Sequence, residues 1–327
     1  MSKRFQLKNV NPNFSTFAEG ANASGDNSVI ALDIQTKLQF LAEDGGIRHE
    51  YEFPSDRHIQ NCGGYIDKLI KYRSQPVREA VAAMFSGQGA AVQLPVLLGR
   101  SILVDTLLTK MIDRFVGSGA GPRAKLFDHG CTVAEHYEMI DQMLAAYCGR
   151  SAQDCLSYYG LDISPLALSA ARLLHPKAPA ADFQLTLAEG SDITLPADSM
   201  DFSMSIGVVN HVQDPVHALN RLIDATRHAT VLVLWITGES QGFWAINHAG
   251  FPNYFFSVKD LNVLAKRYAA KGSFYYADFT PERSSTQTSS YMGISDERLD
   301  LLGSYTLVFC GKDYVVDGLN PIDFGEM

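Results

Sequence analysis

KLFDHGC at residues 125–131, YYGLDIS at 158–164 and AEGSDIT at 188–194 each place an aspartate where an apolar run gives way to a turn. These aspartates are Asp128, Asp162 and Asp192. An apolar strand that ends in an acid just before a turn is typical of an open parallel sheet, which binds its ligands at the carboxyl ends of its strands. Three such ends within about 90 residues predict one site for a ligand with several distinct parts.

Segments with the apolar pattern of a strand and segments with that of a helix alternate around these runs. Strands are expected at 124–130, 156–162, 183–188, 200–207, 230–236, 272–279 and 304–311. Helices are expected at 134–147, 165–174, 216–227 and 258–268, with Ser164 capping the second of them. This alternation predicts an α/β fold with a Rossmann-like doubly wound sheet. Since no clear helix closely links the last two strands, we expect them to form a terminal antiparallel pair.

The N-terminal third of the chain has a different character. Residues 1–28 are rich in Asn, Ser and Gly and predict a loosely ordered arm. Helices follow at 77–85, with Pro76 in its first turn, and from a cap at Ser101 to Phe115. The glycine-rich segment 117–122 breaks the pattern. We therefore expect two domains, a helical N-terminal cap and substrate region at 1–118 and a ligand-binding domain at 119–327.

Composition excludes several classes of partner. The 327 residues carry a formal net charge of −9, which argues against a broad nucleic-acid or anionic-membrane surface. No signal segment and no uninterrupted membrane-spanning stretch is visible. The five cysteines are scattered without a CxxC pair, which favours reduced thiols and a cytoplasmic protein. No metal-ligand spacing such as HExxH occurs, so we expect no catalytic metal.

In element order and motifs, residues 124–311 resemble a class I S-adenosylmethionine (SAM)-dependent methyltransferase of the small-molecule type. The resemblance implies SAM as cofactor and S-adenosylhomocysteine (SAH) as product. The positions that it assigns to the cofactor are Asp128, Gly130, Cys131, Asp162, Ile163, Asp192, Ile193, Gly207 and Val208. It differs at the first turn, where the family has several small residues and this chain has a single glycine before Cys131, Thr132 and Val133.

Elementary chemistry supports the two acids that the resemblance assigns to the nucleoside. Asp162 can accept both hydroxyls of a ribose, because two carboxylate oxygens face a vicinal diol. Its structural alternative is to cap the helix that begins near Pro165. Asp192 can accept from the adenine amine while the Ile193 amide donates to the ring, and Ile163 would cover one face of it. The alternative is an aspartate that bonds its own turn.

Candidates for the acceptor side follow the fourth and fifth strands. His211, with Asn210, comes where the transferred methyl should lie, and could line the cofactor or act as a general base. The loop at 238–256 mixes aromatic and polar groups suited to a small polar substrate, or alternatively to a lid or dimer contact. The candidate substrate-binding residues are Tyr65, Arg73, Glu239, Trp244, Asn247, His248 and Tyr254.

The sequence therefore predicts a methyltransferase that acts on N, O or C of a small polar molecule, with an amine, a guanidine or a specialised biosynthetic metabolite favoured. Two alternatives stay open. A non-catalytic binding or partner subunit would explain the departures in the first turn. A nicotinamide-dependent oxidoreductase would also carry an acid after its second strand, but it should show GxGxxG, and DHGCTVAEH at 128–136 lacks this motif. A homodimer through the N-terminal helices is a further expectation.

Overall fold

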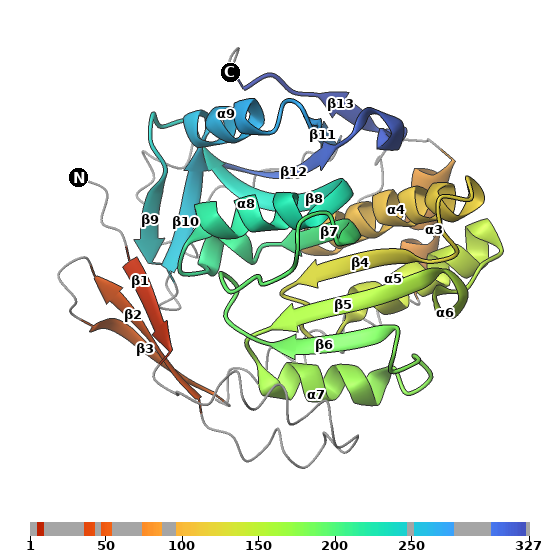
Figure 1. The fold of residues 1–327 in the computed structure, drawn as a ribbon, viewed down its shortest axis with the longest axis horizontal. Coiled ribbons are helices and arrows are strands. Elements are labelled where there is room, and N and C mark those ends of the chain that lie inside the picture. The colour runs from red at the N-terminus through yellow and green to blue at the C-terminus, as the bar shows by residue number, and fades with distance from the viewer. Residues whose placement is uncertain are drawn as a thin grey trace.

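A large mixed sheet forms the centre of the fold in the computed structural model (Figure 1). The structure describes residues 5–9, 36–42, 47–53, 74–86, 96–246, 252–277 and 302–324. The main strands pair in the order β13-β11-β12-β8-β7-β4-β5-β6, and β10 pairs with β8 and β9 beside this path. They are β4 (Ala124–His129), β5 (Leu156–Asp162), β6 (Phe183–Leu187), β7 (Met200–Ile206), β8 (Thr226–Thr237), β9 (Phe243–Ile246), β10 (Pro252–Ser257), β11 (Ser273–Ala277), β12 (Leu302–Cys310) and β13 (Leu319–Pro321).

The pairing directions confirm the predicted fold class. Strands β6, β5, β4, β7 and β8 are parallel neighbours. Strand β12 then pairs antiparallel with β8, and β11 pairs antiparallel with β12. The result is a doubly wound sheet that ends in the expected antiparallel pair.

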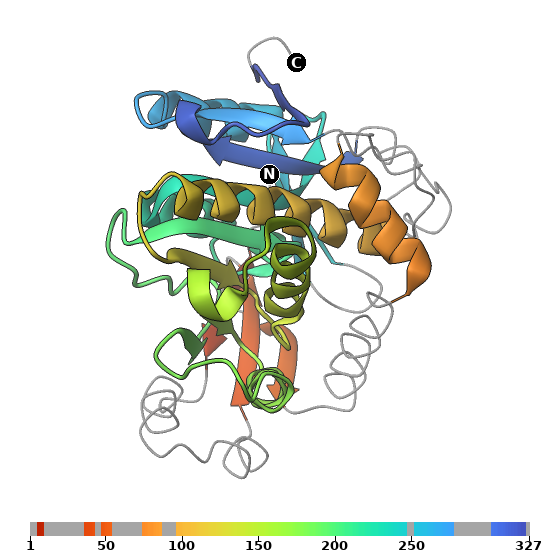
Figure 2. The same ribbon diagram turned by 90° about the vertical axis from the view of Figure 1, so that its right-hand side faces the viewer.

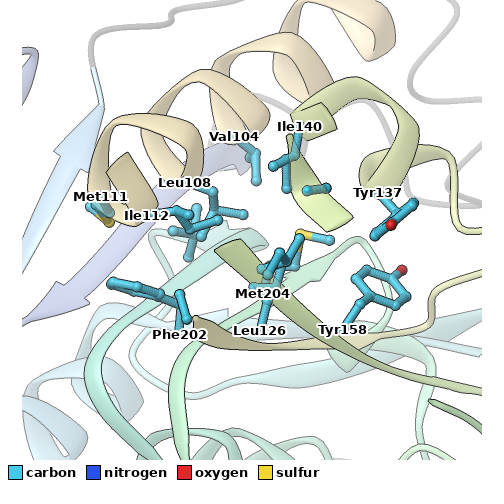
Figure 3. Packing of buried hydrophobic residues seen from close by; sticks show 14 of the residues in the cluster. Val104, Leu108, Met111, Ile112, Leu126, Tyr137, Ile140, Tyr158, Phe202 and Met204 are labelled. Carbon is cyan, nitrogen blue, oxygen red and sulfur yellow. The ribbon is translucent and has the colours of Figure 1, made fainter. Parts of the chain in front are cut away.

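Helices cover both faces of this sheet. They are α3 (Gln75–Phe85), α4 (Val96–Gly117), α5 (Glu135–Met143), α6 (Ala152–Cys155), α7 (Pro165–Leu174), α8 (Pro215–Ala225) and α9 (Val258–Arg267). Short turns of other helix types lie at η1 (Leu144–Cys148), η2 (Val209–His211) and η3 (Lys312–Tyr314). Because successive strand residues point to opposite faces, Leu126 packs under α4 and α5 (Figure 3), whereas Phe127 belongs to the cluster under α8 and α9.

The helix α4 is part of the sheet's own core. Its residues from Val104 to Phe115 supply Leu108, Met111 and Ile112 to the cluster that also holds Phe202 of β7 (Figure 3). Figure 2 shows α3 lying at an angle against α4. The boundary expected between residues 118 and 119 thus falls between α4 and the sheet on which it packs, and the division into domains stays a prediction. Residues 101–117 of α4 are mostly buried within one chain, and the expected dimer through the N-terminal helices stays a prediction.

Two expectations for the N-terminal third were wrong. The segment 1–28, expected to be a loose arm, contains β1 (Phe5–Asn9), which pairs antiparallel with β2 (Thr36–Ala42). Strand β2 pairs in turn with β3 (Ile47–Phe53) to form a small separate sheet. The helix expected to begin at Ser101 begins at Val96, directly after Pro95, and Ser101 is a buried residue within it.

Another difference lies after β8. The segment at 238–256 was expected to be a loop, but β9 and β10 form an antiparallel hairpin within it, in which Trp244 faces Tyr254. The end of this hairpin joins the large sheet, where Phe256 pairs with Ile236 of β8. No helix among the described residues is long and apolar enough to cross a membrane.

Candidate functional site

The strand order changes direction at β4, which has β5 on one side and β7 on the other. From β4 the chain proceeds outward through β5 to β6, then returns to β7 and continues to β8 on the opposite side. The carboxyl ends of β4, β5 and β6 point the same way in Figure 1. A doubly wound sheet opens a ligand-binding crevice at such a reversal, and the predicted cofactor residues lie around it.

The turn after β4 is pinned to the end of β5. The amides of Gly130 and Cys131 both donate to the carbonyl of Leu161, at 2.8 and 3.0 Å. Gly130 has φ +82°, and a Cβ added there would overlap the side chain of Val208, which follows β7. Glycine is therefore required at this point by both backbone conformation and space. The turn thus connects the carboxyl ends of β4, β5 and β7.

Cys131 contributes only its backbone to the turn. Its side chain is fully buried and packs on β5, where a Cβ added to Gly160 would lie 2.6 Å from its sulfur. Burial, with nearby acids, raises the pKa of the Cys131 thiol well above its usual value. A neutral thiol packed in the core is a structural group rather than a nucleophile.

Asp162, the last residue of β5, holds two turns together. Its Oδ2 accepts the Thr132 amide at 2.9 Å, and its Oδ1 accepts the Ser164 amide at 2.8 Å. Burial raises the pKa of Asp162 to about 6, although hydrogen bonds from backbone amides oppose the rise. Ser164 itself caps α7, as expected, by accepting the Ala167 amide at 3.2 Å. Ribose binding by Asp162 stays a prediction.

Asp128 is buried and is bonded within the core. Its carboxylate accepts the hydroxyl of Tyr158, a buried neighbour on β5. Burial raises the pKa of Asp128 to about 7, against the opposing effects of His136 and the Tyr158 hydroxyl. Its backbone still leads directly into the turn after β4, so its assignment to the cofactor site stays a prediction.

His129 is a residue that sequence reasoning missed. Its Nε2 lies 2.8 Å from the carbonyl oxygen of Gly190, and its Nδ1 lies 2.9 Å from the hydroxyl of Ser205. Because a carbonyl can only accept, Nε2 carries the proton and Nδ1 accepts from Ser205. Burial lowers the pKa of His129 to about 4. A neutral imidazole therefore ties β4 to β7 and to the turn after β6.

The turn after β6 depends on a second missed residue, Glu189. Its two carboxylate oxygens accept the amides of Ser191 at 2.6 Å and Gln213 at 3.2 Å, and burial raises its pKa. The sequence feature that could have identified Glu189 is its position two residues after the end of β6. Asp192 is exposed here, while the Ile193 side chain is buried and its carbonyl accepts Arg221 Nε at 3.1 Å. The adenine contacts assigned to these two residues stay predictions.

The end of β7 brings polar groups beside the crevice. The amide of Gly207 donates to the carbonyl of Val233 at 3.2 Å, and a Cβ added to Gly207 would meet open space. His211 closes the η2 turn and is half-buried. Asn210 is fully buried and donates Nδ2 to the Tyr254 carbonyl at 2.5 Å, while its Oδ1 has no hydrogen-bond partner among the described residues. The hairpin β9–β10 is therefore anchored at the end of β7.

The candidate substrate residues divide into two groups. Glu239 follows β8 and donates its amide to Thr237 Oγ1 at 3.1 Å. The Trp244 ring lies edge-on to the Tyr254 ring at 5.3 Å, and the Tyr254 hydroxyl donates to Asp260 at the start of α9 at 3.3 Å. Four candidates lie outside the described residues: Tyr65, Arg73, Asn247 and His248. All seven assignments stay predictions.

Residues 140–234, from α5 through most of β8, match the family model described as a methyltransferase domain. By this match, the segment is part of a methyltransferase domain. The matched part of this methyltransferase domain includes Asp162 and the run after β7, but it begins after the turn that follows β4. No curated protein sequence matches the chain.

Several solved structures resemble the methyltransferase domain weakly. The N-terminal domain of EvdMO1 with SAH bound is 12% identical, with a TM-score of 0.43 over 62% of this chain and 81% of that one. A SAM-dependent methyltransferase from Mesorhizobium loti is 14% identical, with a TM-score of 0.38 over 57% and 91%. A Burkholderia thailandensis 1,6-didemethyltoxoflavin-N1-methyltransferase is 12% identical, with a TM-score of 0.37 over 73% and 92%.

Proposed function

We propose that the methyltransferase domain binds SAM at the carboxyl ends of β4, β5 and β7 and transfers its methyl group to N, O or C of a small polar molecule. One observation carries the proposal. Asp162 ends β5 beside the reversal of strand order, and its carboxylate is bonded to the amide of Thr132 in the turn after β4. This carboxylate thereby connects the end of β5 with the turn after β4. The nucleoside of SAM would lie at the first of these and its amino-acid group at the second.

The residues around the crevice fit such a ligand. A carboxylate offers about four acceptor positions, so the two backbone bonds of Asp162 leave capacity for a ribose diol. The turn at Gly130 brings main-chain atoms to the crevice, and Gly207 adjoins open space. Within the described residues, no group of three or more His, Cys, Asp or Glu side chains is arranged to hold a metal ion.

Bound SAM would supply an electrophilic methyl group. The protein's own task is then to align a nucleophile with that group and to exclude water. His211 and Glu239, which follow β7 and β8, are suited to hold a polar acceptor, with His211 either lining the site or removing a proton. Glu239 would favour a cationic amine or guanidine.

Calorimetric titration with SAH, NADH and NADPH tests the cofactor. Wild-type protein should bind SAH and neither nicotinamide nucleotide. The Asp162→Asn variant should bind SAH about tenfold or more weakly, because it loses charged hydrogen bonds. Asp154→Asn is the matched control, since this exposed residue lies just before the opposite end of β5. Selective binding of NADH or NADPH would instead support an oxidoreductase.

Release of SAH from SAM, measured by mass spectrometry with a panel of amines, guanidines and hydroxylated metabolites, tests catalysis. Accumulation of SAH together with a methylated acceptor is the expected result. Tight SAH binding without turnover on any acceptor would favour the non-catalytic binding subunit.

A further inference from the structure

The turn after β4 holds two residues in a backbone conformation that side chains disfavour. Thr132 has φ +46° and Ala134 has φ +56°, close after Gly130 at +82°. A positive φ is uncommon for any residue with a Cβ and is an outlier for a β-branched residue such as threonine. Contacts elsewhere in the fold therefore have to hold the turn in this shape.

Both polar groups of Thr132 are used for this purpose. Its amide donates to Asp162 Oδ2 at 2.9 Å, and its hydroxyl donates to Glu135 Oε2 at 2.5 Å. The first bond ties the turn to the end of β5 and the second ties it to the first residue of α5. Thr132 itself is only half-buried. It thus lies between solvent and two buried carboxylates, those of Asp162 and Glu135.

Glu135 is fixed in turn by groups beneath it. Its Oε1 lies 3.7 Å from His136 Nε2, and His136 Nδ1 lies 2.8 Å from Asp105 Oδ1 on α4. These three side chains are between 0% and 5% exposed. The carboxylate that receives the Thr132 hydroxyl is therefore held by a buried chain of polar groups that extends to α4, and it has little freedom to move away.

Among the described residues, Asp128 is the other buried acid close to the turn, and its hydrogen bond goes elsewhere. Asp128 is bonded to the Tyr158 hydroxyl, deeper in the sheet. The amide of Ala134 donates to the carbonyl of Cys131 at 2.7 Å, and its own carbonyl accepts the Tyr137 amide at 3.2 Å. These backbone bonds close the turn but place no restraint on the side chain of Thr132. The restraint comes from Glu135.

We propose that Glu135 is a positioning residue for cofactor binding, and that it acts through the Thr132 hydroxyl. This hydroxyl–carboxylate pair stabilises the left-handed turn at a position where a glycine would adopt the conformation unaided. The inference rests on the proposed function, because the turn is assigned to the SAM site. It also explains how the chain can keep a cofactor-binding turn with a single glycine at its start.

Three substitutions at one position separate the roles of hydroxyl, shape and backbone. Thr132→Val keeps the β-branched shape but loses the hydroxyl, so SAH should bind about tenfold or more weakly. Thr132→Ser keeps the hydroxyl and should bind SAH within about threefold of wild type. Thr132→Gly lacks the hydroxyl but adopts positive φ freely, so it should also bind within about threefold. Glu135→Gln should weaken SAH binding in the same direction as Thr132→Val.

Hydrogen exchange of the segment 130–137 in the free protein gives a readout independent of SAH. Exchange should be faster in Thr132→Val than in wild type, and close to wild type in Thr132→Ser. A Thr132→Val variant with a lower melting temperature but unchanged SAH affinity would overturn the positioning role and leave only a structural one. If wild-type protein binds no SAH, the proposed function fails and the inference fails with it, while the exchange data still show whether Glu135 holds the turn.

Discussion

Asp128 lies one residue before the end of β4, and its side chain is buried. Burial raises its pKa from 3.8 to about 7. At a pH between these two values, the Asp128 carboxyl group is ionised in the unfolded chain but protonated in the folded protein. The folded state therefore binds more protons. Asp128 therefore contributes stability at low pH that is lost as the pH rises through about 7.

Asp128→Asn should remove this pH dependence and still accept the Tyr158 hydroxyl. The variant's free energy of unfolding minus that of wild type should increase by up to about 1.4 kcal/mol per pH unit from pH 4 to pH 7. Urea unfolding at several pH values measures the difference. Comparison between the two proteins is essential, because the lowered pKa of His129 acts in the opposite sense in wild type and variant alike. A difference that stays constant with pH would contradict the prediction.

Other residues of the site show why sequence identified some groups and missed others. Asp162 could be found because its strand, its turn and the cap at Ser164 are all encoded within a few neighbouring residues. His129 could not, because its partners Gly190 and Ser205 are 61 and 76 residues away in the chain. Its role exists only after β4 and β7 have paired. The conformation of Thr132 likewise depends on Asp162, 30 residues further on.

At the scale of elements, the sequence was most informative where local signals agree. Strand β5 and helix α7 were predicted with their observed bounds, because an apolar run meets a serine cap and a proline. The hairpin β9–β10 was not predicted, since Gly242, Gly250 and Pro252 divide its sequence into pieces typical of a loop. Its strands exist because they pair with each other and with β8.

The anchoring of this hairpin rests on Asn210. Asn210→Ala removes the buried hydrogen bond to Tyr254, which should lower the free energy of unfolding. The loss should be only about 1 kcal/mol, because the substitution also removes the buried Oδ1 atom that has no hydrogen-bond partner among the described residues. Hydrogen exchange should become faster in β10, whose Tyr254 carbonyl loses its donor. Gln213→Ala is the control, since Gln213 is exposed in the same segment. Equal exchange in the two variants would show that the hairpin is held by its other contacts.

At the scale of the whole molecule, the two edges of the sheet differ in kind. The carboxyl edge carries the buried acids and tight turns of the candidate site. The amino edge carries ion pairs near the starts of the strands, including Arg123 with Asp182 at 2.8 Å and Arg227 with Asp201 at 3.2 Å. Lys271, just before β11, donates to Asp198 at 2.6 Å and to the Ile223 carbonyl at 2.8 Å. The turn assigned to the cofactor, with positive φ at Thr132 and Ala134, thus lies at one edge of the sheet, and these ion pairs lie at the other.

This separation predicts that stability and ligand binding can be changed independently. Lys271→Met keeps the aliphatic stem but loses these bonds, which should lower the free energy of unfolding by about 1 kcal/mol because the lysine is partly exposed. SAH affinity should stay within about twofold, and SAH at a hundred times its dissociation constant should add about 2.7 kcal/mol to either protein. Calorimetry and urea unfolding measure the two quantities, with the exposed Lys266→Met on α9 as control. Weaker SAH binding in Lys271→Met alone would mean instead that the amino edge is coupled, through the strands, to the turns that form the site.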